Sequence, residues 1–109
     1  MLPILIVEDD ITFSLMLSTW LKKKGFDVIS VTTIAEGKKM IEKKSFDIVL
    51  SDLRLPDGDG IELLRWLEEN AYSLPVIVMT GYAEIQTAVQ AMKLGASDYI
   101  SKPINPHEL

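Results

Sequence analysis

Four short apolar runs in this chain each lead into a residue that could take part in phosphoryl chemistry. The first run leads into two carboxylates, Glu8 and Asp9, and the later runs lead into Asp52, Thr80 and Lys102. If the runs are parallel strands of one sheet, their carboxyl ends meet in the crevice where open α/β sheets bind ligands. The pattern therefore predicts one site that could hold a divalent cation and a phosphoryl group.

Carboxylates gathered at one place repel each other and need a cation. A pair of like charges about 4 Å apart costs about 4 kcal/mol at an effective dielectric constant of about 20. Mg²⁺ suits the site because it is a hard cation that binds carboxylates, waters and phosphate oxygens. Lys102 is expected to pair with Asp52 at rest and with phosphoryl oxygens afterwards, and Thr80 with the N–H groups after it should bind another phosphoryl oxygen. Asp52 is the predicted nucleophile, because carboxylates form aspartyl phosphates.

Composition limits the class of protein. A chain of 109 residues that is 48% hydrophobic is expected to form one globular domain, and the lack of cysteine excludes disulfides and thiolate metal sites. The net charge of −5 has the wrong sign for holding a nucleic-acid backbone, so we expect no direct nucleic-acid contact. The opening segment is too charged for a signal peptide or a spanning helix, so we expect a soluble, cytoplasmic protein without a membrane partner.

Hydrophobic periodicity predicts strands that alternate with helices. The first helix should begin after Asp10 as N-cap and stop at Gly25, with its apolar face formed by Phe13, Met16, Leu17, Trp20 and Leu21. Thr33 and Glu36 have the spacing of a capping box and open a second helix through about residue 44. A turn at residues 55–58 precedes a third helix over about 60–69, and the fourth helix stops at Gly95. This order predicts an α/β fold with a parallel sheet and right-handed crossovers, in which the short stretch 28–31 is an edge strand.

The last residues contain the start of a helix without the helix itself. Asn105 can cap, Pro106 suits the first helical position, and Glu108 completes a capping box. An isolated helix needs about 12 or more residues to be even marginally stable. We therefore expect that the natural polypeptide continues and that the last helix is truncated here.

Four motifs together resemble the receiver domain of two-component response regulators, across nearly the whole chain. They are Val7–Asp10, Asp52–Gly60, Met79–Gly81 and Asp98–Pro103. The resemblance implies a flavodoxin-like, doubly wound, five-stranded parallel sheet with strand order 2-1-3-4-5. It also implies that residues 1–109 are one receiver domain, whose last helix and any output domain lie outside this segment.

The resemblance also implies roles for the acidic residues. Asp52 would accept a phosphoryl group from a sensor histidine kinase. Asp9 and Asp52 would bind Mg²⁺ directly, Glu8 would bind it mainly through water, and the backbone carbonyl of Arg54 would complete the protein ligands. Glu8 stands where the family more often has aspartate, and the longer side chain extends the reach to a metal-bound water.

Further roles follow from the same resemblance. Thr80, Gly81 and Lys102 would bind the phosphoryl group, and Tyr99 would move between an outward and an inward position as Thr80 shifts. The peptide bond before Pro103 is expected to be cis, which proline makes accessible.

The predicted function is a phosphorylation-activated signalling switch that relays a conformational change to an output domain or partner. Such a domain catalyses only its own phosphorylation and dephosphorylation, so we do not expect an enzyme with an external substrate. Residues 79–84 and 87–92 are similar to nitrogen-regulator-like proteins, in which the receiver is joined to a sigma-54-activating ATPase and a DNA-binding domain. The missing helix should leave apolar area beside the first helix, so a homodimer is a further expectation for this fragment.

Two other functions compete with this interpretation. A Mg²⁺-dependent phosphohydrolase resembling the haloacid-dehalogenase group also uses an aspartate nucleophile, but that group has an acid where this chain has Arg54, and its acidic pair follows the lysine. A flavin-binding electron carrier could share the fold, but the chain lacks a hydroxyl-rich phosphate loop after the first strand.

Overall fold

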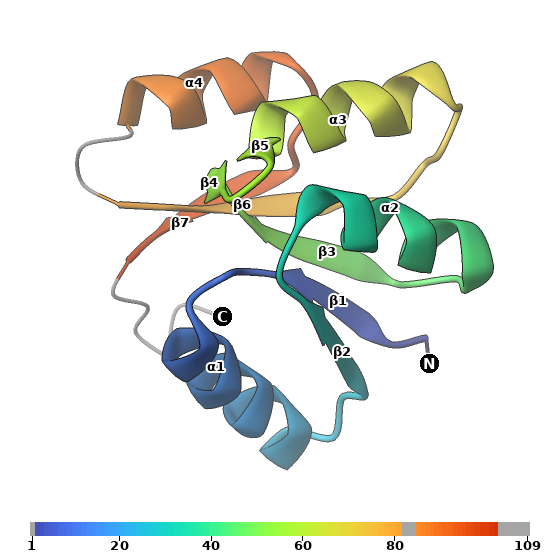
Figure 1. Ribbon diagram of the computed structural model, residues 1–109, viewed down its shortest axis with the longest axis vertical. Coiled ribbons are helices and arrows are strands. Elements are labelled where there is room, and N and C mark those ends of the chain that lie inside the picture. Colours follow the sequence, from blue (N-terminus) through green and yellow to red (C-terminus); the bar gives the residue numbers. More distant parts are fainter. Residues whose placement is uncertain (1, 82–84, 103–109) are drawn as a thin grey trace.

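The computed structural model describes residues 2–81 and 85–102, and residues 1, 82–84 and 103–109 lie outside the described part. Parallel strands form one five-stranded sheet in the order β2-β1-β3-β6-β7 (Figure 1). Their bounds are β1 Ile4–Val7, β2 Val28–Val31, β3 Ile48–Asp52, β6 Val76–Thr80 and β7 Asp98–Ser101. Counted along the chain, this is the predicted order 2-1-3-4-5 with β2 at one edge, so the flavodoxin-like fold is confirmed.

Helices cover both faces of the sheet. They are α1 Ile11–Lys23, α2 Ile34–Lys43, α3 Gly60–Glu69 and α4 Ile85–Lys93. Figure 1 shows α1 on one face of the sheet and α2, α3 and α4 on the other. Because successive side chains of a strand point to opposite faces, the strands contribute to two cores. One core packs Leu5, Val7, Val49 and Val78 with residues of α2, α3 and α4, and the other packs Ile4, Ile6, Leu50 and Met79 with Leu17 and Leu21 of α1.

The predicted helix ends are confirmed in their capping residues. Asp10 Oδ1 accepts a hydrogen bond from the N–H of Phe13 at 3.0 Å, and Thr33 Oγ1 accepts one from the N–H of Glu36 at 3.1 Å. Gly25 and Gly95, which follow α1 and α4, have φ values of 94° and 103°. These positive values are a conformation that glycine adopts without strain, so the sequence marks the helix ends correctly.

Two local features differ from the expectation. Met16, placed on the buried face of the first helix, is 47% exposed, because the buried face of α1 is formed by Ser14, Leu17, Ser18 and Leu21. The turn at residues 55–58 is the end of a short antiparallel hairpin, in which β4 Arg54–Leu55 pairs with β5 Gly58–Asp59. The hairpin stands between the end of β3 and the start of α3, and so borders the edge where the candidate site lies.

The helix start at 105–108 and the peptide bond before Pro103 lie outside the described residues. Within the described ranges, every helix is too short or too polar to span a bilayer.

Candidate functional site

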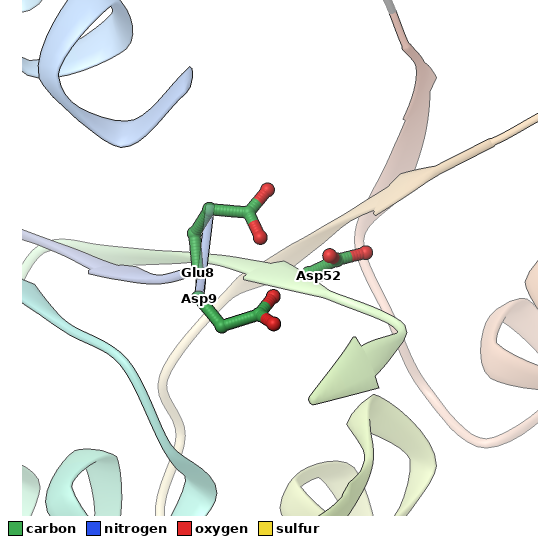
Figure 2. A group of neighbouring side chains, drawn as sticks. All are labelled: Glu8, Asp9 and Asp52. Atoms are coloured by element: carbon green, nitrogen blue, oxygen red, sulfur yellow. The ribbon is translucent and has the colours of Figure 1, made fainter. Parts of the chain in front are cut away.

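Three carboxylates meet at the carboxyl edge of the sheet. Glu8 and Asp9 follow β1 and Asp52 ends β3, and these neighbouring strands pair in a register that places Val7 beside Ser51. Each residue offers a carboxylate oxygen that lies within 4.8 Å of those of the other two. Figure 2 shows the three carboxylates turned toward a common space. The topology thus brings together residues that are more than forty positions apart in the sequence.

The carboxylate of Asp52 is held from two sides. Its Oδ1 accepts a hydrogen bond from the N–H of Leu53 at 2.8 Å and a longer one from the N–H of Arg54 at 3.5 Å. Its Oδ2 accepts from Lys102 Nζ at 3.1 Å. Asp52 is only 8% exposed, so these contacts fix the orientation of a nearly buried carboxylate.

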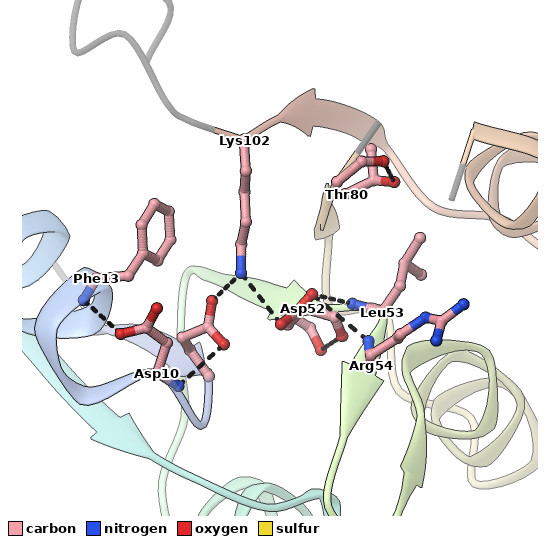
Figure 3. Close-up of polar contacts among 10 residues, drawn as sticks. Asp10, Phe13, Asp52, Leu53, Arg54, Thr80 and Lys102 are labelled. Atoms are coloured by element: carbon pink, nitrogen blue, oxygen red, sulfur yellow. Dashed lines mark hydrogen bonds and ion pairs between the residues drawn. The ribbon is translucent and has the colours of Figure 1, made fainter. Parts of the chain in front are cut away.

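Lys102 lies between two of the carboxylates. Its Nζ donates to Glu8 and, as Figure 3 shows, to Asp52. Its backbone N–H donates to the carbonyl of Thr80 at 2.8 Å. Nζ also lies 4.6 Å from the centre of the Phe13 ring, a favourable place for a cation. Burial lowers the pKa of Lys102, but the bonds to Glu8 and Asp52 outweigh this effect and the net pKa is raised. Lys102 therefore stays charged in the site.

Glu8 is fully buried, and burial is the largest influence on the pKa of its carboxyl. Burial raises the pKa of Glu8 to about 7, against the lowering effect of the bond to Lys102. The second carboxylate oxygen of Glu8 accepts from the N–H of Asp10 at 3.3 Å. One ammonium is thus not enough to keep Glu8 fully ionised beside Asp52.

The donor set fits Mg²⁺. It consists of hard carboxylate oxygens at the mouth of a partly buried site, with two residues buried and Asp9 exposed. Lys102 balances only part of the negative charge of Glu8, Asp9 and Asp52, so a further cation is favoured. Mg²⁺ prefers such oxygen ligands and keeps waters, for which the exposed side of Asp9 leaves room.

The remaining predicted residues lie around this cluster. Thr80 ends β6 one position beyond Met79, which pairs with Asp52. Thr80 is fully buried, and its hydroxyl donates to the carbonyl of Gly81 at 3.0 Å. Arg54 begins the hairpin two positions after Asp52, and Tyr99 on β7 is 45% exposed.

Sequence reasoning missed two contacts around the site. Phe13 was expected only to pack, but its ring lies beside the ammonium of Lys102. Asp57 was expected only in a turn, but its carboxylate binds the start of α2. For Phe13 a signal was available, since a residue three positions after the N-cap Asp10 lies in the first helical turn, at the same edge as the end of β1.

The arrangement agrees with comparisons to known proteins. Residues 4–109 match the family described as the response regulator receiver domain. The chain is 37% identical over 106 residues to the photosynthetic apparatus regulatory protein RegA of Rhodobacter capsulatus, covering 97% of this chain and 58% of RegA. It is 38% identical over 102 residues to the transcriptional regulatory protein ZraR of Klebsiella oxytoca, covering 94% of this chain and 23% of ZraR.

A solved structure agrees as well. Full-length FixJ from B. japonicum superposes with a TM-score of 0.93 at 34% identity, over 98% of this chain and 53% of FixJ. The chain therefore spans only part of the length of these relatives. The family match over residues 4–109, the identities and the shared fold lead to one conclusion: the chain belongs to the response regulator receiver domain family.

Proposed function

We propose that this chain is a phosphorylation-activated signalling switch in which Asp52 accepts a phosphoryl group from a sensor histidine kinase. One observation carries the proposal. The Asp52 carboxylate contacts the ammonium of Lys102 at 3.1 Å, and it also lies within 4.8 Å of the oxygens of two further carboxylates. A nucleophile between a cation and a candidate metal site is what phosphoryl transfer requires.

The transfer step uses the carboxylate of Asp52. One of its oxygens attacks phosphorus in line with the donor, so that an O–P bond forms while the bond from phosphorus to the leaving nitrogen breaks, and the nitrogen keeps the electron pair. The N–H of Leu53 holds the carboxylate in orientation at 2.8 Å. Lys102, already beside Asp52, is placed to balance the charge of the incoming phosphoryl oxygens.

A cation completes the charge balance. Glu8, Asp9, Asp52 and the backbone carbonyl of Arg54 would hold Mg²⁺, with Glu8 acting mainly through water. When bound, Mg²⁺ supplies positive charge that offsets the negative oxygens of the phosphoryl group. Such a charge would lower the pKa of Glu8, which burial raises.

Phosphorylation then changes the partners of nearby groups. The ammonium of Lys102 turns from Glu8 and Asp52 to one phosphoryl oxygen. The hydroxyl of Thr80 leaves the carbonyl of Gly81 and binds a second phosphoryl oxygen, together with the N–H of Gly81. Tyr99, now 45% exposed, moves inward as Thr80 shifts. New contacts of this kind need only bias two states that differ by about a few kcal/mol. We also propose that the peptide bond before Pro103, outside the described residues, is cis.

The partners follow from this switch. We propose a cytoplasmic protein whose receiver is joined to an output domain that binds DNA, with the receiver itself making no nucleic-acid contact. The chain is about equally identical to RegA and to ZraR, but it covers 58% of one and 23% of the other. Sequence identity within the receiver therefore does not indicate which type of output domain is attached. We propose the nitrogen-regulator-like output on the basis of residues 79–84 and 87–92. A homodimer through exposed apolar residues is proposed as well.

The test is a time course of phosphorylation with a small acyl phosphate as donor. Wild-type chain with Mg²⁺ should gain one phosphoryl group per molecule, and both Asp52→Asn and removal of Mg²⁺ should abolish the labelling. Asp27→Asn is the matched control, because Asp27 is an exposed aspartate that precedes β2 at the opposite edge of the sheet. Many turnovers on ordinary phosphomonoesters would instead support a phosphohydrolase, and labelling that survives in Asp52→Asn would refute the proposal.

A further inference from the structure

The hairpin that follows Asp52 is too short to hold itself in place. Arg54 pairs with Asp59 and Leu55 with Gly58, so each strand has two residues. Even a longer isolated hairpin is marginally stable in water, so the position of this one depends on its contacts with the rest of the molecule. These contacts matter because the hairpin begins with Arg54, whose carbonyl is one of the proposed Mg²⁺ ligands.

Both ends of the hairpin are fixed close to Asp52. At its start, the N–H of Arg54 lies 3.5 Å from Asp52 Oδ1. At its end, the N–H of Gly60 donates to the carbonyl of Leu53 at 2.9 Å. A Cβ on Gly60 would lie 2.8 Å from the backbone oxygen of Asp52, so no larger residue fits there without a backbone shift. The tip is therefore the part of the hairpin that needs another anchor.

Asp57, at the tip, is anchored to a different element. Its Oδ1 accepts from the N–H of Ile34 at 2.9 Å and its Oδ2 accepts from the N–H of Ala35 at 3.0 Å, across 23 and 22 residues of chain. These are the first two residues of α2, where a negative charge is favoured. Burial raises the pKa of the Asp57 carboxyl, but the two N–H donors outweigh this effect and the net pKa lies below its usual value.

The start of α2 thus has two caps from different parts of the chain. Thr33, the residue directly before the helix, caps it locally through the N–H of Glu36 at 3.1 Å. Asp57 takes the N–H groups of Ile34 and Ala35 from the hairpin. Either cap serves the helix, but only Asp57 also ties the helix to the segment that follows the phosphoacceptor.

We propose that Asp57 is a positioning residue for the metal site, which ties the hairpin to α2 and thereby holds Arg54 beside the Asp52 carboxylate. The inference rests on the proposed function, because it assumes that Mg²⁺ binds at Asp52. It has a reciprocal consequence: if the anchor favours the metal, the metal must favour the anchor by the same factor. Mg²⁺ should therefore slow hydrogen exchange at the amides of Ile34 and Ala35.

The two caps provide a matched pair of variants. Thr33→Ala and Asp57→Ala each remove a cap of α2, and both should lower the urea midpoint by a similar amount. Isothermal titration with Mg²⁺ should separate them. Asp57→Ala should weaken Mg²⁺ binding by about tenfold, as loss of a group that orients a ligand does, whereas Thr33→Ala should change it by less than about twofold. Asp57→Asn keeps one acceptor oxygen and should give an intermediate affinity, and it carries the same comparison if Asp57→Ala does not fold.

The possible results distinguish a failure of the Asp57 proposal from a failure of the proposed function. Wild-type affinity retained in both Asp57 variants would overturn the inference alone, as would equal weakening in Thr33→Ala and Asp57→Ala, which would indicate a general effect of destabilising α2. A wild-type chain that binds no Mg²⁺ would overturn the proposed function and the inference with it. Slower exchange at Ile34 and Ala35 on adding Mg²⁺, lost in Asp57→Ala, would support the anchor directly.

Discussion

The apolar cores of the sheet and its carboxyl edge are built from the same strands but differ in what burial does to them. Val7 ends β1 and Glu8 follows it, and both side chains are 0% exposed. Burying a valine stabilises the fold by about 1.5–3 kcal/mol, whereas burying Glu8 raises its pKa and disfavours its charged form. The cores thus stabilise the fold, while the carboxyl edge brings like charges together at a cost in stability.

The largest effect on stability is expected in the core. Leu63 of α3 is fully buried among the residues that pack under α2, α3 and α4. Leu63→Ala should lower the free energy of unfolding by about 2–5 kcal/mol, since it removes buried methyl groups and leaves a cavity. Urea denaturation measures the loss, and phosphorylation per folded molecule should not change. Arg65→Ala, an exposed position on the same helix, is the control, and equal losses for the two variants would contradict the assignment of the core.

At the carboxyl edge, a substitution should instead change mainly the rate of phosphorylation. Lys102→Met removes the ammonium that contacts Glu8 and Asp52 but keeps an apolar stem. The rate of Asp52 phosphorylation should fall by about 100-fold, because one group that stabilises the transferring phosphoryl charge is lost. Mg²⁺ should still bind, as titration calorimetry can check. Lys93→Met, at the exposed end of α4, should leave the rate unchanged, and a rate within about twofold of wild type in Lys102→Met would contradict the proposed role.

Removing the buried charge at the edge should stabilise the fold, with a defined pH dependence. Well below pH 4.5 Glu8 is neutral in both states, whereas well above about 7 it is charged in both, including when buried in the folded state. Between these values the folded state holds the extra proton, so the Glu8 contribution to stability falls as the pH rises. Without Mg²⁺, Glu8→Gln should therefore be more stable than wild type by about 1–3 kcal/mol at about pH 8, and the difference should vanish in acid. Urea midpoints across this pH range would contradict the account if the difference between the two proteins did not change with pH.

The smallest effect on stability is expected for an apolar side chain that is exposed. Leu15 of α1 is 65% exposed, while Leu17, two positions on, is 1% exposed. Leu15→Gln should change the free energy of unfolding by less than about 0.5 kcal/mol, and Leu17→Gln by much more. Sedimentation of the same variants tests the proposed homodimer, because Leu15→Gln removes exposed apolar surface. If Leu15→Gln matched Leu17→Gln in stability, the burial pattern of α1 would be wrong.

The strands, and the residues that gather at their carboxyl edge, could be predicted from the sequence, because buried strands are short runs of apolar residues. The apolar runs end at Glu8, Asp52 and Thr80, and a parallel sheet brings such ends to one edge whatever their separation in the chain. The caps Asp10 and Thr33 were predictable for a related reason, since their hydrogen bonds reach only three residues along the chain.

The rest depended on contacts that local patterns do not encode. The bond of Lys102 to Glu8 crosses 94 residues, and the bonds of Asp57 to α2 cross 23 and 22. The exposure of Met16 depends on how α1 is rotated about its own axis against the sheet. The amphipathic spacing of the apolar residues fixes this rotation only to within about one helical position.

Asp52 is the proposed carrier of the transferable phosphoryl group. The most direct measurement is to phosphorylate the wild-type chain with an acyl phosphate and Mg²⁺, digest it at acid pH, and locate the group by mass spectrometry. The phosphoryl group should be found on Asp52 and on no other residue. A phosphoryl group on Glu8, Asp9 or a hydroxyl side chain, with Asp52 unmodified, would contradict it.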